Sequence, residues 1–108
     1  HSNMTSAKDA GLILEKIYKG ECVSAKYSKE MLNLLLHQTR RWKIPAGLPS
    51  GIKCANKTGE NDSCQNDVAI VYGKKTTYIV CIFSQTYEGS GVSGIRALSS
   101  KIYRALNN

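Results

Sequence analysis

Residues 68 to 83 read VAIVYGKKTTYIVCIF, which is two apolar runs joined by a short polar turn. Both runs are rich in β-branched residues, and such nearly continuous apolar runs are typical of strands that are buried on both faces. The turn Gly73-Lys74-Lys75 is short, so the two runs predict an antiparallel hairpin. Upstream, Ile52 to Lys57 alternates loosely between apolar and polar residues, as a third strand with one wetter face would.

Apolar residues at helical spacing flank these strands on both sides. A first helix is predicted to stop at Gly20, and a second to begin near Ser28. Gly89 to Gly94 interrupts the pattern before a last helix. The apolar stripes are Ile13, Leu14, Ile17 and Tyr18, then Met31, Leu34, Leu35 and Gln38, and finally Ile95, Leu98, Ile102 and Leu106.

The order of elements is therefore α-α-β-β-β-α. It predicts an α+β fold in which helices pack on an antiparallel three-stranded sheet. The last helix would cover one face of the sheet, and the two early helices look too small to cover the other. This shortfall predicts that residues 1–108, which show no internal domain boundary, form part of a larger sandwich.

Length and composition limit the other classes. The 108 residues fit one domain, and a hydrophobic content of 42% is enough for a core. No apolar run approaches the ~20 residues of a membrane-spanning helix. The N-terminus is polar through Lys8, so no signal peptide is visible. Any contact with a membrane is therefore expected only through a segment outside this chain.

The formal net charge of +7 invites a nucleic-acid interpretation. The tight basic cluster is Arg40-Arg41-Trp42-Lys43, and a basic patch beside an aromatic ring can grip phosphate and stack a base. No recognised nucleic-acid motif accompanies it, so a solvated connection with Trp42 tucked against the core is the favoured interpretation, and no nucleic-acid partner is expected.

Four cysteines, at positions 22, 54, 64 and 81, lack CxxC spacing and a nearby histidine pair, so we expect no zinc. Cys54 and Cys64 flank the Lys57 turn on neighbouring strands, which makes a disulfide between them conceivable. Free thiols are the favoured alternative. His37 is predicted near a helix end, and neither it nor His1 has an evident acid partner.

Lys57-Thr58-Gly59 ends the first strand and leads into the hairpin. If an active-site serine lay beside it, a lysine there could hold a substrate carboxylate and help to move protons around the nucleophile. The Thr58 hydroxyl can bind the same carboxylate, and Gly59 lets a ligand approach the strand without a Cβ clash. The next backbone N–H, that of Glu60, would form half of an oxyanion hole. A polar turn with a solvent-facing lysine is the alternative explanation.

The order of these features resembles the C-terminal part of class A β-lactamase-like serine hydrolases. A lysine, a small hydroxyl residue and a glycine on an edge strand form one active-site element of serine β-lactamases and penicillin-binding proteins. Here the element follows Ile44-Pro45-Ala46-Gly47-Leu48-Pro49 and precedes Asn66-Asp67-Val68-Ala69-Ile70-Val71-Tyr72. The resemblance runs from His1 to Asn108. It implies a helical domain beside a helix–sheet–helix domain.

The resemblance also implies what this chain does not carry. The family's nucleophilic serine belongs to an SxxK element, which a Ser-x-Asn element faces, and both precede the matched region in sequence. Ser50-Gly51-Ile52-Lys53 matches SxxK by spelling, but its glycine and the nearby prolines oppose the helical turn that the motif needs. We therefore expect this chain alone to be inactive and the complete enzyme to be a serine hydrolase.

Two positions depart from the family pattern. Many class A β-lactamases place an arginine on the strand after the turn to hold the substrate carboxylate, and Asn66 stands at the matching position. Glu60 is larger and more acidic than the residue usual at its position. Both differences would suit a weak or degenerate enzyme.

The first hypothesis is a hydrolase that acylates its serine with a β-lactam or a D-Ala-D-Ala-like amide and then hydrolyses the ester. Lys57 and Glu60 would be catalytic, and Lys57, Thr58, Gly59 and Asn66 would bind substrate. No metal or cofactor is expected. The partners would be a β-lactam or a peptidoglycan-peptide-like small molecule, and the missing N-terminal portion of the same enzyme or a second copy of the chain.

The family's substrates lie outside the cytoplasmic membrane, so the resemblance implies an extracytoplasmic location. A second hypothesis is a non-catalytic basic α+β module that binds a protein or nucleic-acid partner through Arg40, Arg41 and Lys43. A third is a relative that keeps the fold and has lost catalysis.

Overall fold

The computed structural model describes residues 7–60, 65–84 and 88–108. The predicted α+β fold and the order of its helices and strands are confirmed. The elements are α1 (Ala7–Tyr18), α2 (Ala25–Leu36), the short 3-10 helix η1 (Pro45–Gly47), β1 (Lys53–Glu60), β2 (Gln65–Tyr72), β3 (Thr77–Ser84) and α3 (Glu88–Asn107).

The three-stranded sheet is antiparallel, with β2 between β1 and β3. Successive side chains on a strand point to opposite faces. Cys54 lies in the core under α3, whereas Ala55 lies in the core under α1 and α2. By this alternation Thr58 belongs to the α3 face, and Lys57 and Gly59 belong to the opposite face.

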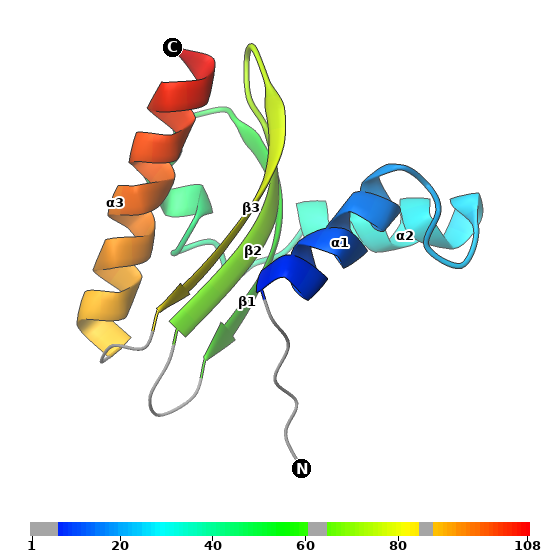
Figure 1. The fold of residues 1–108 in the computed structure, drawn as a ribbon, viewed down its shortest axis with the longest axis horizontal. Helices are drawn as coiled ribbons and strands as arrows, with labels where there is room; N and C mark the ends of the chain where they lie inside the picture. The colour runs from blue at the N-terminus through cyan, green and yellow to red at the C-terminus, as the bar shows by residue number, and fades with distance from the viewer. Residues whose placement is uncertain (1–6, 61–64, 85–87) are drawn as a thin grey trace.

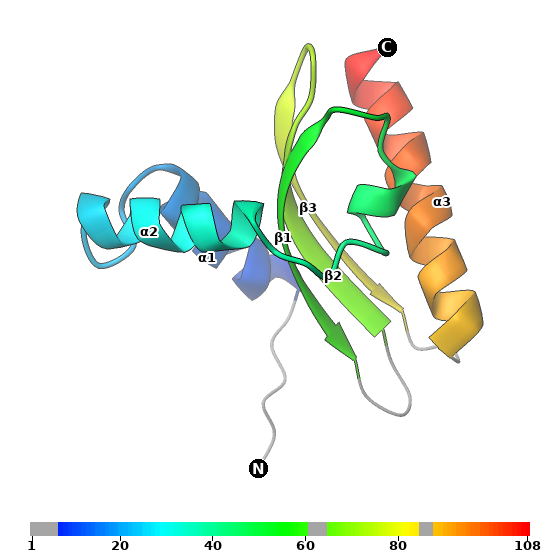
Figure 2. The ribbon, with the colours of Figure 1, turned by 180° about the vertical axis from the view of Figure 1, so that it is seen from behind.

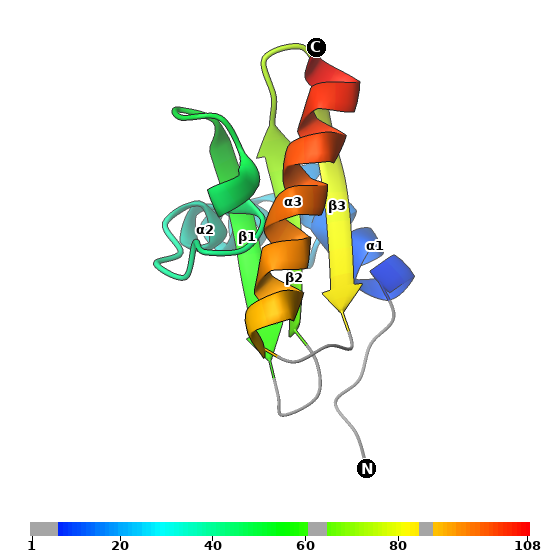
Figure 3. The same cartoon turned by 90° about the vertical axis from the view of Figure 1, so that its left-hand side faces the viewer.

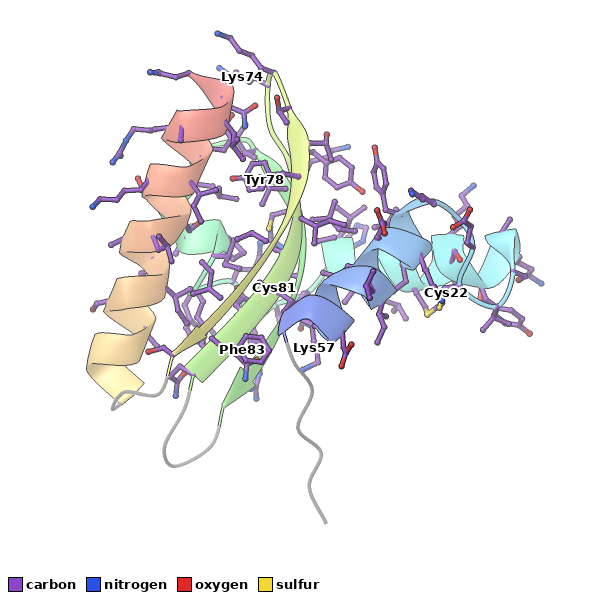
Figure 4. The ribbon with its side chains drawn as sticks, in the orientation of Figure 1. Cys22, Lys57, Lys74, Tyr78, Cys81 and Phe83 are labelled. Carbon is purple, nitrogen blue, oxygen red and sulfur yellow. The ribbon has the colours of Figure 1, made fainter. Side chains whose placement is uncertain are left out.

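Helices lie on both faces of the sheet, so the molecule has three layers (Figure 1). The long α3 crosses the face on which Tyr78 points toward it (Figure 4). On the other face, α2 packs against β1 and α1 packs against β3 and β2. Figure 3 looks through α3 onto the sheet, with β1, β2 and β3 side by side behind it.

The early helices end and begin at clear local signals. Gly20 has φ +76°, and its N–H donates to the carbonyl of Ile17 while the N–H of Glu21 donates to Lys16, a Schellman motif that stops α1. Ser24 caps α2 by accepting from the N–H of Tyr27. α2 therefore begins earlier than the predicted start near Ser28.

Helix α3 differs from its prediction in two respects. It begins at Glu88, because the glycines of residues 89–94 lie inside the helix and do not interrupt it. Its buried row is Ile95, Ser99 and Tyr103, four residues apart, while Leu98 and Leu106 are exposed. The small Ser99 lets the helix approach the chain before β1 closely, and its hydroxyl donates to the carbonyl of Ile44 at 2.8 Å.

The layer formed by α1 and α2 leaves apolar surface uncovered. Its exposed residues include Leu12, Ile13, Tyr18, Tyr27, Leu34 and, on β3, Phe83. The predicted stripes are thus only partly buried, which agrees with the expected shortfall on this face. β3 is also wetter than its apolar sequence predicted, because it is an edge strand. No helix among the described residues is long and apolar enough to span a membrane.

The short helix η1 packs against α3 (Figure 2). Gly47, in η1, allows this close approach because it has no side chain. A Cβ at this position would lie 2.3 Å from the carbonyl oxygen of Arg96 and 3.0 Å from the Cβ of Ser99. We expect Gly47→Ala to lower the free energy of unfolding by about 1–3 kcal/mol, because backbone must move to admit the methyl group. Urea denaturation measures this.

Gly94→Ala is the matched control, because a Cβ at Gly94 meets no atom within 4 Å and the residue lies in α3 itself. This variant should be neutral or up to about 1 kcal/mol more stable, since alanine favours helix over glycine. Equal stability of the two variants would contradict the close packing assigned to Gly47.

Candidate functional site

Lys57-Thr58-Gly59 lies inside strand β1, which runs from Lys53 to Glu60. The polar turn of the alternative explanation is therefore wrong, although its solvent-facing lysine agrees with the exposed Lys57, and the strand runs past Lys57, where it was predicted to end. Pairing with β2 extends through this polar end, since Gly59 is in register with Asn66. The three residues are held by a strand ladder, and the side chain of Lys57 is exposed on the face toward α1 and α2 (Figure 4).

A buried lysine fixes the backbone at this end of the strand. Lys43 is 0% exposed, and its Nζ donates to the carbonyl oxygens of Gly59 and Asn66, both at 3.1 Å. The carbonyls of a facing antiparallel pair point either into the space between the strands or away from each other. One ammonium reaches both oxygens only in the first case, so the carbonyl of Gly59 faces β2.

The carbonyls at alternate positions of β1 therefore face the free edge of the sheet. Arg41 covers the earlier part of this edge, because its Nη2 donates to the carbonyl of Cys54 at 3.1 Å. Further along, the Nζ of Lys57 donates to the carbonyl of Thr58 at 2.6 Å. The backbone N–H of Glu60 follows on the same edge. The end of the strand thus presents an ammonium, a carbonyl and an N–H together.

Gly59 and Asn66 are in close contact across the two strands. A Cβ on Gly59 would lie 2.7 Å from the Oδ1 of Asn66, so a larger residue would displace the Asn66 amide. Lys57, Gly59 and Asn66 therefore share one face, and their role in binding substrate stays a prediction.

Thr58 points to the opposite face, next to Asp67 in the register. Its residue is 3% exposed, and its Oγ1 is buried without a hydrogen-bond partner among the described residues. Buried hydroxyls are normally paired, because an unpaired one costs about 1–3 kcal/mol. Its role as a ligand for a carboxylate stays a prediction.

The loop before β1 is tied to the strand by a buried polar network that the sequence did not reveal. The carboxylate of Asp67 accepts from the N–H of Ile44 at 2.8 Å and from the Nδ2 of Asn56 at 3.2 Å. Asn56 also donates to the carbonyl of Arg40 at 3.0 Å, and its Oδ1 accepts from Arg41. Asp67 and Asn56 are both 0% exposed.

Burial raises the pKa of Asp67 above its ordinary value, and the N–H of Ile44, the amide of Asn56 and the ammonium of Lys43 oppose the shift. One sequence signal could have found this residue. Asp67 has the same parity on its strand as Ala69 and Val71, which point into the core under α3. A carboxylate at an inward position needs buried donors, and the nearby basic cluster could supply them.

The basic cluster is therefore divided rather than being one solvated patch. Lys43 is fully buried and Arg41 is bonded to β1, while Arg40 is exposed with its guanidinium 5.7 Å from the ring centroid of Trp42. Trp42 is 39% exposed, so the prediction that it is tucked against the core is wrong. Because Lys43 has no contact with solvent, it cannot belong to the phosphate-gripping surface of the second hypothesis, which would have to rest on Arg40, Arg41 and Trp42.

Ser50 and His37 lie where the sequence predicted them. Ser50 lies in an exposed turn followed by Gly51 at φ +86°, so no helical turn brings it to Lys53. His37 ends α2, with its Nδ1 2.8 Å from the carbonyl oxygen of Asn33. No group of residues that could hold a metal ion occurs in the described part of the chain. Two surface hollows lie along α2 and between α1 and the sheet, and Lys57 lines neither of them.

Cys22, Cys54 and Cys81 carry free thiols, as favoured, and Cys64 lies outside the described residues. Burial raises the pKa of Cys54 to about 12, so at pH 8 only about 10⁻⁴ of this thiol is ionised. We expect iodoacetamide at pH 8 to modify the partly exposed Cys22 well before Cys54, as peptide mass spectrometry would measure.

The alkylation rate of Cys54 should rise about tenfold per pH unit below its pKa. The control is the same reaction in urea, where both thiols should react alike. Equal rates for Cys22 and Cys54 in the folded protein would contradict the burial of Cys54.

Residues 1–106 match the β-lactamase enzyme family. The chain belongs to this family. The search of curated proteins found no match. Among solved structures, PBP-A superposes with a TM-score of 0.83 at 27% identity over 94% of this chain. The extended-spectrum β-lactamase TLA-1 superposes with a TM-score of 0.80 at 26% identity over 96% of it.

These relatives are much longer than the sequence in hand. The chain spans 39% of PBP-A and 42% of TLA-1. A β-lactamase from Sphaerobacter thermophilus, 24% identical over 91% of this chain with a TM-score of 0.82, shows the same fold. The resemblance to a C-terminal portion of the family is therefore confirmed. A variant of PBP-A has been solved as an acyl-enzyme complex with penicillin G.

Proposed function

We propose that this chain supplies the substrate-binding strand of a serine hydrolase that reacts with β-lactams or D-Ala-D-Ala-like amides through an acyl-serine intermediate. The observation that carries the proposal is the free edge of β1. Arg41 covers that edge up to Cys54, and the edge then presents the ammonium of Lys57, the carbonyl of Thr58 and the N–H of Glu60. Family membership and the acyl complex of the PBP-A variant support this assignment.

The edge can act on an amide substrate in two ways. Its carbonyl and N–H can pair with a ligand as a further strand would, which aligns the scissile bond along β1. The N–H of Glu60 can then bind the oxyanion that forms when the serine attacks. The serine and the base that activates it would come from outside this chain, so the strand supplies binding and charge stabilisation.

Lys57 supplies the charge at this edge. Its ammonium donates a hydrogen bond to the carbonyl of Thr58 at 2.6 Å. Because Lys57 is exposed, the side chain can turn from this carbonyl to a substrate carboxylate at small cost in free energy. Asn66 lies on the same face but carries no charge, and the hydroxyl of Thr58 is buried on the opposite face, so binding of the carboxylate would depend on Lys57. The substrates proposed here lie outside the cytoplasmic membrane, which supports an extracytoplasmic location for the complete protein.

Labelling with a fluorescent penicillin tests the proposal. The complete gene product and this 108-residue chain are incubated with the label, denatured and resolved on a gel. Label on the complete product that survives denaturation, with none on this chain, would support an acyl-serine outside the chain. Label on this chain would point to Ser50 and overturn the assignment. If neither product is labelled, the proposed reaction with β-lactams is contradicted, and only the assignment of the fold is kept.

A further inference from the structure

We propose that Lys43 is a positioning residue that orients and polarises the Gly59–Glu60 peptide, whose N–H is the oxyanion donor of the proposed function. The inference rests on that function for its catalytic consequence. Its structural basis is the ammonium of Lys43, which lies 3.1 Å from the carbonyl oxygen of Gly59. This lysine comes from the loop before β1.

The peptide bond itself carries the link from Lys43 to the edge. The described chain has no cis peptide, so the carbonyl of Gly59 and the N–H of Glu60 point in opposite directions from one planar unit. The pairing with β2 directs the carbonyl into the space between β1 and β2, and Lys43 bonds it there. The N–H is thereby directed away from the sheet, toward the place where a substrate carbonyl would lie.

The charge of Lys43 should also strengthen this N–H as a donor. An ammonium that bonds a carbonyl draws electron density from the peptide, and hydrogen bonds in such chains polarise one another. Water does not screen the effect, because Lys43 is 0% exposed. A neutral residue of similar shape would fill the space and leave the peptide less polarised.

The carboxyl of Asp67 makes a charged lysine tolerable at this depth. The positive charge of Lys43 helps to stabilise the ionised form of Asp67, against the desolvation that opposes it. The carboxylate of Asp67 also accepts a hydrogen bond, at 2.8 Å, from the N–H of Ile44, the residue that follows Lys43. The stem of the lysine is therefore fixed at its base, and its ammonium is fixed at Gly59 and Asn66.

The test compares Lys43→Met and Lys43→Gln in the complete gene product, with Lys53→Met as the control. Lys53 is exposed at the start of the same strand, so its loss should change nothing at Gly59. Labelling with carbonyl-¹³C glycine and ¹⁵N glutamate selects Gly-Glu peptides by NMR. In this chain these are Gly59–Glu60 and Gly20–Glu21, and the second serves as an internal reference.

We expect both Lys43 variants to move the Gly59 carbonyl carbon and the Glu60 amide proton upfield, with Gly20–Glu21 unchanged. Acylation by penicillin should slow by about tenfold or more, short of the about 10²–10³ that follows complete loss of an oxyanion donor. The dissociation constant of the unreacted penicillin should stay the same. A role in folding alone would lower stability and leave both the NMR shifts and the acylation rate of the folded variants unchanged.

The outcomes separate this inference from the proposed function. If the wild-type protein forms no acyl-enzyme, the proposed function fails, and the NMR shifts still decide whether Lys43 polarises this peptide. If the wild type is acylated and both folded variants keep its shifts and rate, the inference is overturned. The amide of Lys43→Gln can still donate to one of the two carbonyls, so we expect this variant to be the more stable of the two. If Lys43→Met does not fold, the comparison is made with Lys43→Gln.

Discussion

Lys57→Ala is expected to slow the acylation of the complete gene product by penicillin by about 10²–10³-fold. The substitution removes the ammonium that lies on the open edge of β1, bonded to the carbonyl of Thr58. The fold should survive, because the side chain is exposed and the strand is held by its ladder with β2. Stopped-flow measurement of acyl-enzyme formation over a range of penicillin concentrations gives the rate and the affinity separately.

Lys53→Ala is the matched control for this experiment. Lys53 is an exposed lysine on the same strand and the same face, but it lies beside Tyr72, far along the ladder from Gly59. Loss of Lys53 should leave the acylation rate unchanged. Comparing the two variants therefore separates the specific effect of Lys57 from a general effect of removing one positive charge. Near-normal acylation by Lys57→Ala would remove the active-site assignment of this strand.

The sheet could be predicted from sequence because its signals are local. Each strand has its own apolar or alternating run, and the Gly73 turn fixes an antiparallel pair. The predicted ends of helices and strands were wrong where tertiary contacts outweigh the local conformational preference of the residues. Residues 89–94 are rich in glycine and yet form the first turns of α3, and the strand β1 continues through polar residues because β2 offers it hydrogen bonds.

The candidate site was found only in part. Lys57, Thr58 and Gly59 are adjacent in sequence, so a short motif was enough to select them. Lys43 and Asp67 lie far apart in the chain and meet only after β1 and β2 have paired. Nothing in a single sequence marks Lys43 as the buried member of a basic cluster. Its burial depends on how the loop between α2 and β1 packs against the sheet.

Asp67→Ala should lower the free energy of unfolding by about 3–5 kcal/mol. The N–H of Ile44 and the amide of Asn56 would lose their acceptor, and a buried donor left unpaired costs about 1–3 kcal/mol. Lys43 would lose its buried counter-charge. Urea denaturation followed by fluorescence of Trp42, the single tryptophan of the sequence, measures the change.

Glu15→Ala is the control for the loss of a carboxylate. Glu15 forms a surface pair with Lys19 at 3.5 Å, and such pairs contribute about 0.2–1 kcal/mol, so this variant should stay close to wild type. A double-mutant cycle with Lys43→Met then isolates the coupling. Removing Lys43 should cost less in the Asp67→Ala background than in the wild type, because the buried charge that it leaves unpaired is already gone. Additive costs would mean that Asp67 and Lys43 stabilise the fold independently, with no coupling between the two buried charges.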